Sequence, residues 1–234
     1  MKKLIVLTAA MLGSSLAPAQ APAPKKSGIE AQGYQWNAQE GEKIEALKKK
    51  GDIKNGEEAY EVCGACHLPS GAGRPDGTFP QLAGQHATVL IKQMADIREG
   101  LRDNPTMYPF AKTLTDPQEL ADVATYIQSL CIPTNHGKYE GADASLQIAK
   151  GKDLYENECK ECHGVNGEGN KEKFYPVIAG QHYKYLLRQM TDIRDGKRRN
   201  ANPDMVKIIK KYDDKQLVAI SAFQSNLSMP GAMC

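Results

Sequence analysis

The sequence predicts an all-α protein made of two copies of one helical domain. Apolar residues recur at helical spacing in several segments, and no segment shows the alternating pattern of a β-strand. Short motifs also recur at a constant offset of 96 residues, which is typical of tandem domains. A chain of 234 residues leaves room for two domains that each bury a core.

The repeat consists of three motifs: Cys-x-x-Cys-His, Pro-x-x-Ala-Gly-Gln-His and Gln-Met-x-Asp-Ile-Arg. They cover residues 63–67, 80–86 and 93–98 in the first copy, and residues 159–163, 176–182 and 189–194 in the second. Beyond them the register slips by two residues, which indicates a loop of variable length. We therefore expect one domain over residues 53–132 and another over residues 146–234, joined by the Gly-containing, polar linker 133–145.

Each copy is expected to contain three main helices. The last helix of the first copy opens at Asp116 as N-cap, with Glu119 placed for a capping box. Its counterpart in the second copy contains Leu217 and Ile220 on its apolar side. The first helix runs into the cysteine motif over residues 56–62 and 150–158, and the middle helix covers residues 87–99 and 183–195.

The amino terminus has the form of an export signal. Lys2 and Lys3 precede an apolar stretch over residues 4–16, and Ala17-Pro18-Ala19 has the small-x-small pattern that signal peptidase cuts. We expect residues 1–19 to be removed and the mature chain to be located in the periplasm. The apolar stretch is shorter than the roughly 20 residues that span a bilayer. The alternative is that the segment stays uncleaved as a membrane anchor, and a peripheral association of the protein with the membrane also stays open.

Residues 20–52 are expected to form an extension before the first domain. Its first part, residues 20–33, is rich in Ala, Pro, Lys and Gly, which is typical of a tether. Residues 38–50 have helical composition, with Ile44 and Leu47 as a thin apolar stripe. We expect this short helix to pack on the first domain.

The composition is that of a globular protein of nearly neutral charge. A hydrophobic content of 41% with 25% charged residues excludes a collagen-like or wholly disordered chain. Thirty Lys and Arg stand against 28 Asp and Glu, and two of these lysines lie in the export signal. This balance leaves little to attract a polyanion, so we expect no nucleic-acid partner.

The Cys-x-x-Cys-His motif predicts a covalently attached haem in each copy. On an exported chain, two thiols at this spacing can form thioether bonds with the vinyl groups of haem, and the adjacent histidine can ligate the iron. The alternatives are a zinc site made from both cysteine pairs, which would have to join two domains, and a redox dithiol, which is expected beside a strand and helix pattern. The predicted haem attachment residues are Cys63, Cys66, Cys159 and Cys162, and the predicted proximal iron ligands are His67 and His163.

A methionine in each copy is the expected second axial ligand. Met107 and Met205 lie 40 and 42 residues after the proximal histidines, each in a Pro-containing loop between two helices. A thioether on such a loop could swing over the open face of the haem. Met94 and Met190 also repeat, but they fall on the apolar side of the middle helix, where methionine commonly fills gaps in a core.

Three further histidines are candidates for ligands or for structural groups. His86 and His182 recur at the start of the middle helix, where a role at the helix start or the haem edge is favoured over ligation of iron. His136 lies alone in the linker and is expected to be solvated.

With histidine and methionine on each iron, no coordination position is left for a substrate. A thioether opposite imidazole raises the reduction potential of the iron, which suits respiratory electron transfer. We therefore predict an electron carrier and not an enzyme. Its cofactors would be two covalently bound haem c groups, its partners redox proteins, and it would have no small-molecule substrate.

The combination of motifs, from about residue 52 to residue 227, resembles the dihaem cytochrome c4 family. The resemblance implies two class I cytochrome c folds that face each other across a pseudo-twofold axis, with haems close enough for internal electron transfer. It also implies a periplasmic carrier between a respiratory donor complex and a terminal oxidase or reductase. Tyr185 matches a tyrosine of the family's second domain, whereas the first copy has Val89. If that tyrosine contacts a haem propionate, the two haems differ in environment.

Two features depart from the family, namely the long amino-terminal extension and an additional cysteine after the last helix of each domain. These cysteines, Cys131 and Cys234, could form a disulfide or remain free. The basic residues that flank Met205 are either solvated surface or a basic rim that steers an acidic partner. They are Lys197, Arg198, Arg199, Lys207, Lys210 and Lys211.

Two alternative functions stay open at this point. One is the dihaem electron-transfer subunit of a larger oxidoreductase, such as a flavocytochrome sulfide dehydrogenase. The other is a dihaem enzyme such as thiosulfate dehydrogenase, which needs one haem with an open or labile position.

Overall fold

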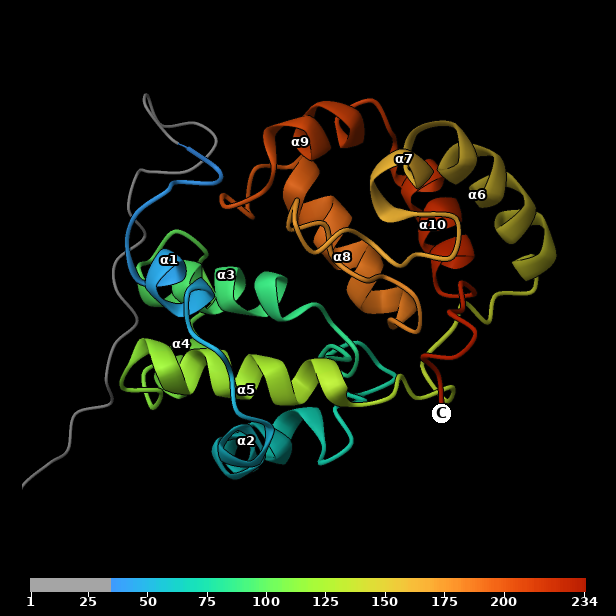
Figure 1. The fold of residues 1–234 in the computed structure, drawn as a ribbon. Helices are drawn as coiled ribbons and strands as arrows, with labels where there is room; N and C mark the ends of the chain where they lie inside the picture. Colours follow the sequence, from blue (N-terminus) through green and yellow to red (C-terminus); the bar gives the residue numbers. More distant parts are fainter. Residues whose placement is uncertain (1–34) are drawn as a thin grey trace, which may run out of the picture.

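Two groups of five helices lie side by side in the computed structural model, which describes residues 35–234 (Figure 1). Within these residues the β pairing is limited to isolated bridges, so the all-α prediction is confirmed. The expected signal peptide lies outside the described residues. The first half contains α1 (Glu42–Leu47), α2 (Ile53–His67), α3 (Ala87–Arg98), α4 (Tyr108–Ala111) and α5 (Pro117–Ser129). The second contains α6 (Ala144–Glu158), α7 (Lys160–His163), α8 (Tyr183–Arg194), α9 (Pro203–Ile209) and α10 (Asp214–Gln224).

The first long helix of each half packs across the last one, α2 on α5 and α6 on α10. A glycine lies at each crossing. A Cβ atom on Gly56 would come within 2.1 Å of the Asp122 carbonyl oxygen, and one on Gly151 within 1.9 Å of the Ala219 carbonyl oxygen. The sequence placed the helix starts at or beside these glycines, but the helices begin earlier, because the glycines permit a close crossing inside each helix and do not mark its end.

The middle helices α3 and α8 match the prediction to within one residue. The start of α5 also lies where expected, since the Asp116 carboxylate accepts hydrogen bonds from the backbone N–H groups of Gln118 and Glu119. The capping box is incomplete there, because the Glu119 carboxylate bonds Thr115. The complete box occurs at the start of α10, between Asp213 and Gln216.

The extension packs on the first half, as predicted. Helix α1 is shorter than expected, lies against α3 and α5, and buries Ala46 completely. Just before it, the Trp36 ring contacts the Phe174 ring of the second half, and no sequence pattern predicts this contact. Among residues 35–234, no helix combines the length and apolar character that a membrane crossing requires.

The two halves meet through pairs of equivalent contacts, in which each contact is related to the other by the 96-residue offset of the repeat. The Gln85 side chain donates to the Val177 carbonyl and accepts from the Val177 N–H, both at 2.9 Å. Gln181 makes the same pair of bonds to the backbone of Gln81, at 2.9 and 3.0 Å. All four residues are buried, so the amides complete polar groups that would otherwise be unsatisfied. Such reciprocity is the signature of a twofold relation between two similar units.

Ile132, just after α5, lies between the two halves. Its side chain is fully buried, and it contacts a glycine of each half. A Cβ on Gly84 would approach Ile132 to 2.6 Å and a Cβ on Gly180 to 2.4 Å. The carboxyl terminus is tied to the same point, because the Ile132 N–H donates to the Ala232 carbonyl at 2.8 Å. Next to it Cys131 and Cys234 form a disulfide with their Cα atoms 5.4 Å apart, so of the two states left open for these cysteines the bonded one is found.

Candidate haem sites

The first cysteine motif forms the carboxyl-terminal end of α2. Cys63 and Cys66 are half-buried free thiols, and the His67 ring is 3% exposed. The His67 Nδ1 atom lies 2.9 Å from the Pro80 carbonyl oxygen, which makes Nδ1 the protonated nitrogen. The other ring nitrogen, Nε2, is buried and has no hydrogen-bond partner. A buried, oriented and unpartnered imidazole nitrogen is the state expected of an iron ligand.

The second motif repeats this arrangement with a small difference in the backbone. Helix α6 ends at Glu158, and α7 carries Cys162 and His163 after a break at Cys159. The His163 Nδ1 atom lies 3.3 Å from the carbonyl oxygen of Pro176, the counterpart of Pro80. In both halves, therefore, a carbonyl from the Pro-x-x-Ala-Gly-Gln-His segment fixes the orientation of the histidine ring.

The alternatives to haem find little support at these cysteines. Burial raises the pKa of the Cys63 thiol to about 11 and that of Cys159 to about 12, the reverse of what a reactive redox dithiol requires. Among the described residues, no group of three or more His, Cys, Asp or Glu side chains could hold a metal ion. The two motifs thus fit separate haem groups. Cys63, Cys66 and His67 would hold one, and Cys159, Cys162 and His163 would hold the other.

The predicted methionine ligands both lie next to short helices. Met107 is the N-cap residue of α4, and Met205 is in the first turn of α9, so the expectation of a plain loop is wrong for Met205. Pro203 can occupy the first turn of α9 because its missing N–H would have no partner there. Met190 is 4% exposed in the core of the second half, and Met94 packs against the core of the first. Ligation by Met107 and Met205 stays a prediction.

His86 and His182 connect the two halves. The Nε2 atom of His86 lies 2.8 Å from the Glu168 carbonyl oxygen, and that of His182 lies 2.9 Å from the Ala72 carbonyl oxygen. The two contacts are equivalent in the repeat, because both the histidines and the carbonyls are offset by 96 residues. These residues therefore serve the interface, a role the sequence did not reveal. His136 is not merely solvated, because its Nε2 lies 2.7 Å from the Ser225 carbonyl oxygen in a partly buried position.

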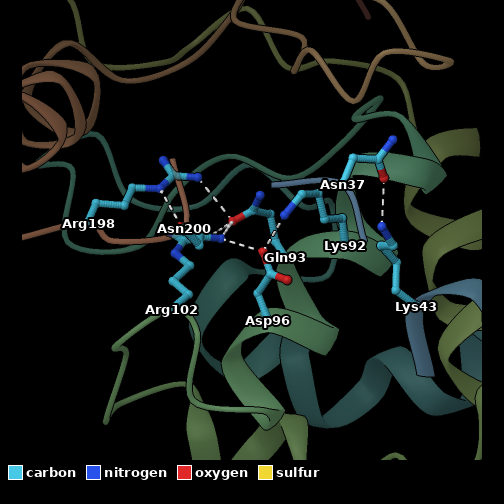
Figure 2. A network of polar contacts seen from close by, with 8 residues as sticks. All are labelled: Asn37, Lys43, Lys92, Gln93, Asp96, Arg102, Arg198 and Asn200. Carbon is cyan, nitrogen blue, oxygen red and sulfur yellow. Dashed lines mark hydrogen bonds and ion pairs between the residues drawn. The ribbon is translucent and has the colours of Figure 1, made fainter. Parts of the chain in front are cut away.

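A polar network with excess positive charge lies in the same interface (Figure 2). Gln93 and Gln189, which are equivalent in the repeat, each accept hydrogen bonds from both Arg102 and Arg198. Burial lowers the pKa of Arg198 to about 10, and Arg102 contributes to the same shift. Arg198 is therefore an interface residue and not part of a basic rim. Guanidinium groups in this setting suit carboxylates such as the propionates of haem.

Tyr185 lies beside the guanidinium groups of this network. Its hydroxyl is 3.5 Å from Arg102. Burial alone would raise the pKa of Tyr185, yet Arg102 and Arg198 outweigh burial and leave it below the ordinary value. At the equivalent position the first half has a buried valine, Val89, which offers no hydroxyl to a guanidinium group.

Comparisons with known proteins agree with this geometry. The cytochrome c family model matches residues 53–131 and again residues 148–228. A cytochrome c4 from Azotobacter vinelandii is 34% identical over 189 residues, which cover 76% of this chain and 90% of that protein. The chain belongs to the dihaem cytochrome c4 family. It accordingly carries two covalently bound haem c groups and functions in electron transfer.

A crystal structure of reduced cytochrome c4 from Pseudomonas stutzeri matches with a TM-score of 0.66 and 31% identity, over 76% of this chain and all of that one. This likeness supports two tandem cytochrome c folds. A thiosulfate dehydrogenase electron acceptor from Stutzerimonas stutzeri is 32% identical over 72% of this chain and 80% of its own length.

Proposed function

We propose that this cytochrome is a periplasmic carrier that moves electrons between a respiratory donor complex and a terminal oxidase or reductase. Haem supplies one-electron exchange at its iron. The chain would hold each haem through two thioethers and one imidazole, and Met107 and Met205 would complete the two irons. The observation that carries the proposal is the buried Nε2 atom of His67, which has no partner although Nδ1 is fixed by the Pro80 carbonyl.

The chain's own residues then act by orientation and exclusion. The Pro80 and Pro176 carbonyls keep the proton of each proximal histidine on Nδ1, which leaves Nε2 free for iron. A thioether on the opposite side would close the remaining position to reactants. The molecule would thus exchange electrons with other proteins and leave small molecules unchanged.

The decisive measurement is the near-infrared sulfur-to-iron band of the oxidised protein, in the parent and in Met107→Ala and Met205→Ala variants. Each substitution should remove half of the band, and Met94→Ala, as a matched control, should leave it intact. An unchanged band in Met107→Ala or Met205→Ala would assign the ligand elsewhere. Rapid binding of carbon monoxide to the ferrous parent would indicate an open iron and favour an enzyme.

A second candidate is the electron acceptor of a dehydrogenase for a sulfur compound, which the similarity to a thiosulfate dehydrogenase electron acceptor favours. The test mixes the oxidised cytochrome with thiosulfate, with and without a thiosulfate dehydrogenase. Reduction only in the presence of the dehydrogenase supports an acceptor. Reduction by thiosulfate alone would make the chain itself the enzyme.

The compartment can be tested on the mature protein. Export predicts that the protein isolated from the periplasmic fraction begins at Gln20. A mature chain that still begins at Met1 and sediments with membranes would support the uncleaved anchor.

A further inference from the structure

The extension before the first cytochrome unit contacts the second one through aromatic rings. The Trp36 ring lies edge-on to the Phe174 ring, with the centroids 6.1 Å apart and the planes at 82°. The Lys43 ammonium lies 5.4 Å from the centre of the same Phe174 ring, and Lys43 is 6% exposed. Phe174 is therefore held by an edge-on aromatic contact and by a buried cation, two arrangements that are favourable for an aromatic ring.

The first half holds this segment firmly. The Lys43 ammonium donates to the Asn37 side chain at 2.6 Å, as Figure 2 shows. The Glu42 carboxylate pairs with Arg98 of α3 at 2.9 Å. The Lys92 ammonium, also from α3, lies 5.2 Å from the centre of the Trp36 ring. Because α1 also packs on α3 and α5, the segment moves with the first half.

The segment is also continuous with the polar interface. The Asp96 carboxylate accepts from Lys92 at 2.6 Å and from Asn200 of the second half at 2.7 Å (Figure 2). Lys92 thus contacts Trp36 on one side and, through Asp96, the second half on the other. The extension and the interface between the halves form one connected set of contacts.

The backbone of Phe174 supports a specific role for this contact. Its φ angle is +56°, in the left-handed region that bulky residues rarely adopt. The equivalent residue of the first half is Thr78, and among the described residues only Leu68 and Phe174 have positive φ without being glycine. Phe174 lies in a turn that is closed by two backbone hydrogen bonds between Asn170 and Tyr175, both at 2.9 Å, and this turn presents the Phe174 side chain to Trp36 and Lys43 of the extension.

We propose that the segment from Trp36 to Leu47 is a clamp between the two cytochrome units, anchored on α3 and α5 and closed on Phe174, which sets the orientation through which electrons pass between the haems. The proposal rests on the electron-transfer function but not on the identity of the methionine ligands. Electron transfer between fixed cofactors depends steeply on their separation, so a small rotation of the second half would change its rate. Trp36, Lys43 and Phe174 would be positioning residues.

The test measures how fast one electron distributes between the two haems of the holoprotein after flash reduction. Trp36→Ala and Phe174→Gly should each slow this step several-fold, and the double variant should be no slower than either single one, because both remove the same contact. Trp36→Phe should restore most of the rate. Leu146→Ala, at an exposed apolar position on α6 away from the clamp, should match the parent.

Phe174→Gly separates positioning from stability. Glycine accepts the positive φ angle without strain, so this variant should unfold at a temperature close to that of the parent while its electron distribution is slowed. An unchanged rate in both Trp36→Ala and Phe174→Gly would overturn the clamp. Since the readout needs only two haems with separable spectra, it remains valid even if the near-infrared band assigns other iron ligands.

Discussion

The two halves share one fold, yet they surround their cysteine motifs differently. Helix α2 runs without interruption into His67, whereas Cys159 separates α6 from α7 before His163. His67 is almost fully buried and lies 2.9 Å from its carbonyl partner, while His163 is half-buried and lies 3.3 Å from its own. Haem potentials depend on burial and on hydrogen bonds to the axial ligand. The two halves therefore share the interface contacts but differ in the environments of their proximal histidines.

The halves also differ in how the rest of the chain restrains them. The first half is covered by α1 from the extension. The second half is closed by the Cys131–Cys234 disulfide, which spans a sequence separation of 103 residues that includes all of its helices. One half is therefore restrained by packing and the other by a covalent loop, and the two should respond differently to the same change.

Loss of haem should produce the largest effect. Replacing both cysteines of one motif with alanine should halve the haem content of the protein, because the two thioether bonds can no longer form. The affected domain, of about 80 residues, then has a thin core without the porphyrin. The first-half variant, Cys63→Ala with Cys66→Ala, should lose amide exchange protection in α2 and α5. The second-half variant should lose less in α6 and α10, since the disulfide limits the unfolded chain. An equal loss of exchange protection in both variants would show that the disulfide does not stabilise the second half.

Removal of the disulfide should have the next largest effect. Cys131→Ser combined with Cys234→Ser should lower the free energy of unfolding by about 2–5 kcal/mol, as expected for a long closed loop. Exchange protection should fall around Ile132 and α10 and stay nearly unchanged in α2. The parent treated with a reductant serves as control and should behave like the double variant. A melting temperature equal to that of the parent would show that the loop contributes nothing.

Much of the fold could be predicted because the information is local. Apolar periodicity and the preceding Gly-Gln-His turn placed α3 and α8 to within one residue. The constant offset of the motifs predicts the duplication, and the cysteine motifs predict the covalently attached haem. The predicted starts of α2 and α6, at residues 56 and 150, are too late, because the tight crossings at Gly56 and Gly151 depend on distant partners that the local sequence does not show.

The interface could not be predicted, because its partners are far apart in sequence. Gln85 and Val177 are separated by 92 residues, and nothing near Gln85 indicates which backbone it completes. The recurrence of Ala-Gly-Gln-His was the available signal, but it pointed equally to a helix start. The Trp36 and Phe174 contact had no counterpart in the repeat at all, so only the packing of two halves reveals it.

Acidification should distinguish the two interface histidines. His182 is 1% exposed, and both ring nitrogens are engaged, since Nδ1 accepts from the Gly137 N–H at 3.0 Å. Burial lowers its pKa from the ordinary value of 6.5; nearby His136 adds to the shift, and the Ala72 carbonyl and Asp76 oppose it. Below about pH 6.5 the His182 side chain is protonated in the unfolded chain while it stays neutral in the folded chain. The stability that the neutral, buried His182 contributes is therefore present above about pH 6.5 and is lost as the pH falls below it.

The melting temperature of the parent should therefore fall as the pH is lowered from about 7.5 to about 5.5, and that of His182→Gln should fall less over the same range. His86→Gln serves as the matched control. Burial also lowers the pKa of His86, but its ring is only half-buried and its hydrogen bond is to the Glu168 carbonyl, so this variant should keep most of the parent's pH dependence. Identical pH dependence in the two variants would show that the buried proton balance is not specific to His182.

The smallest expected difference lies at the starts of the last helices. At α10 the Asp213 carboxylate caps the Gln216 N–H while the Gln216 side chain returns to the Asp213 N–H, so both orphan groups are satisfied. At α5 the Glu119 carboxylate bonds Thr115, and Asp116 alone caps the helix.

Asp213→Ala and Asp116→Ala should each cost about 1 kcal/mol of unfolding free energy. Gln216→Ala should add a loss at α10, whereas the equivalent Glu119→Ala should free only Thr115, which is exposed and can bond water. Denaturant unfolding of the four variants measures this, and a larger loss for Glu119→Ala than for Gln216→Ala would mean that the Thr115 contact, not the capping box, is the stronger helix start.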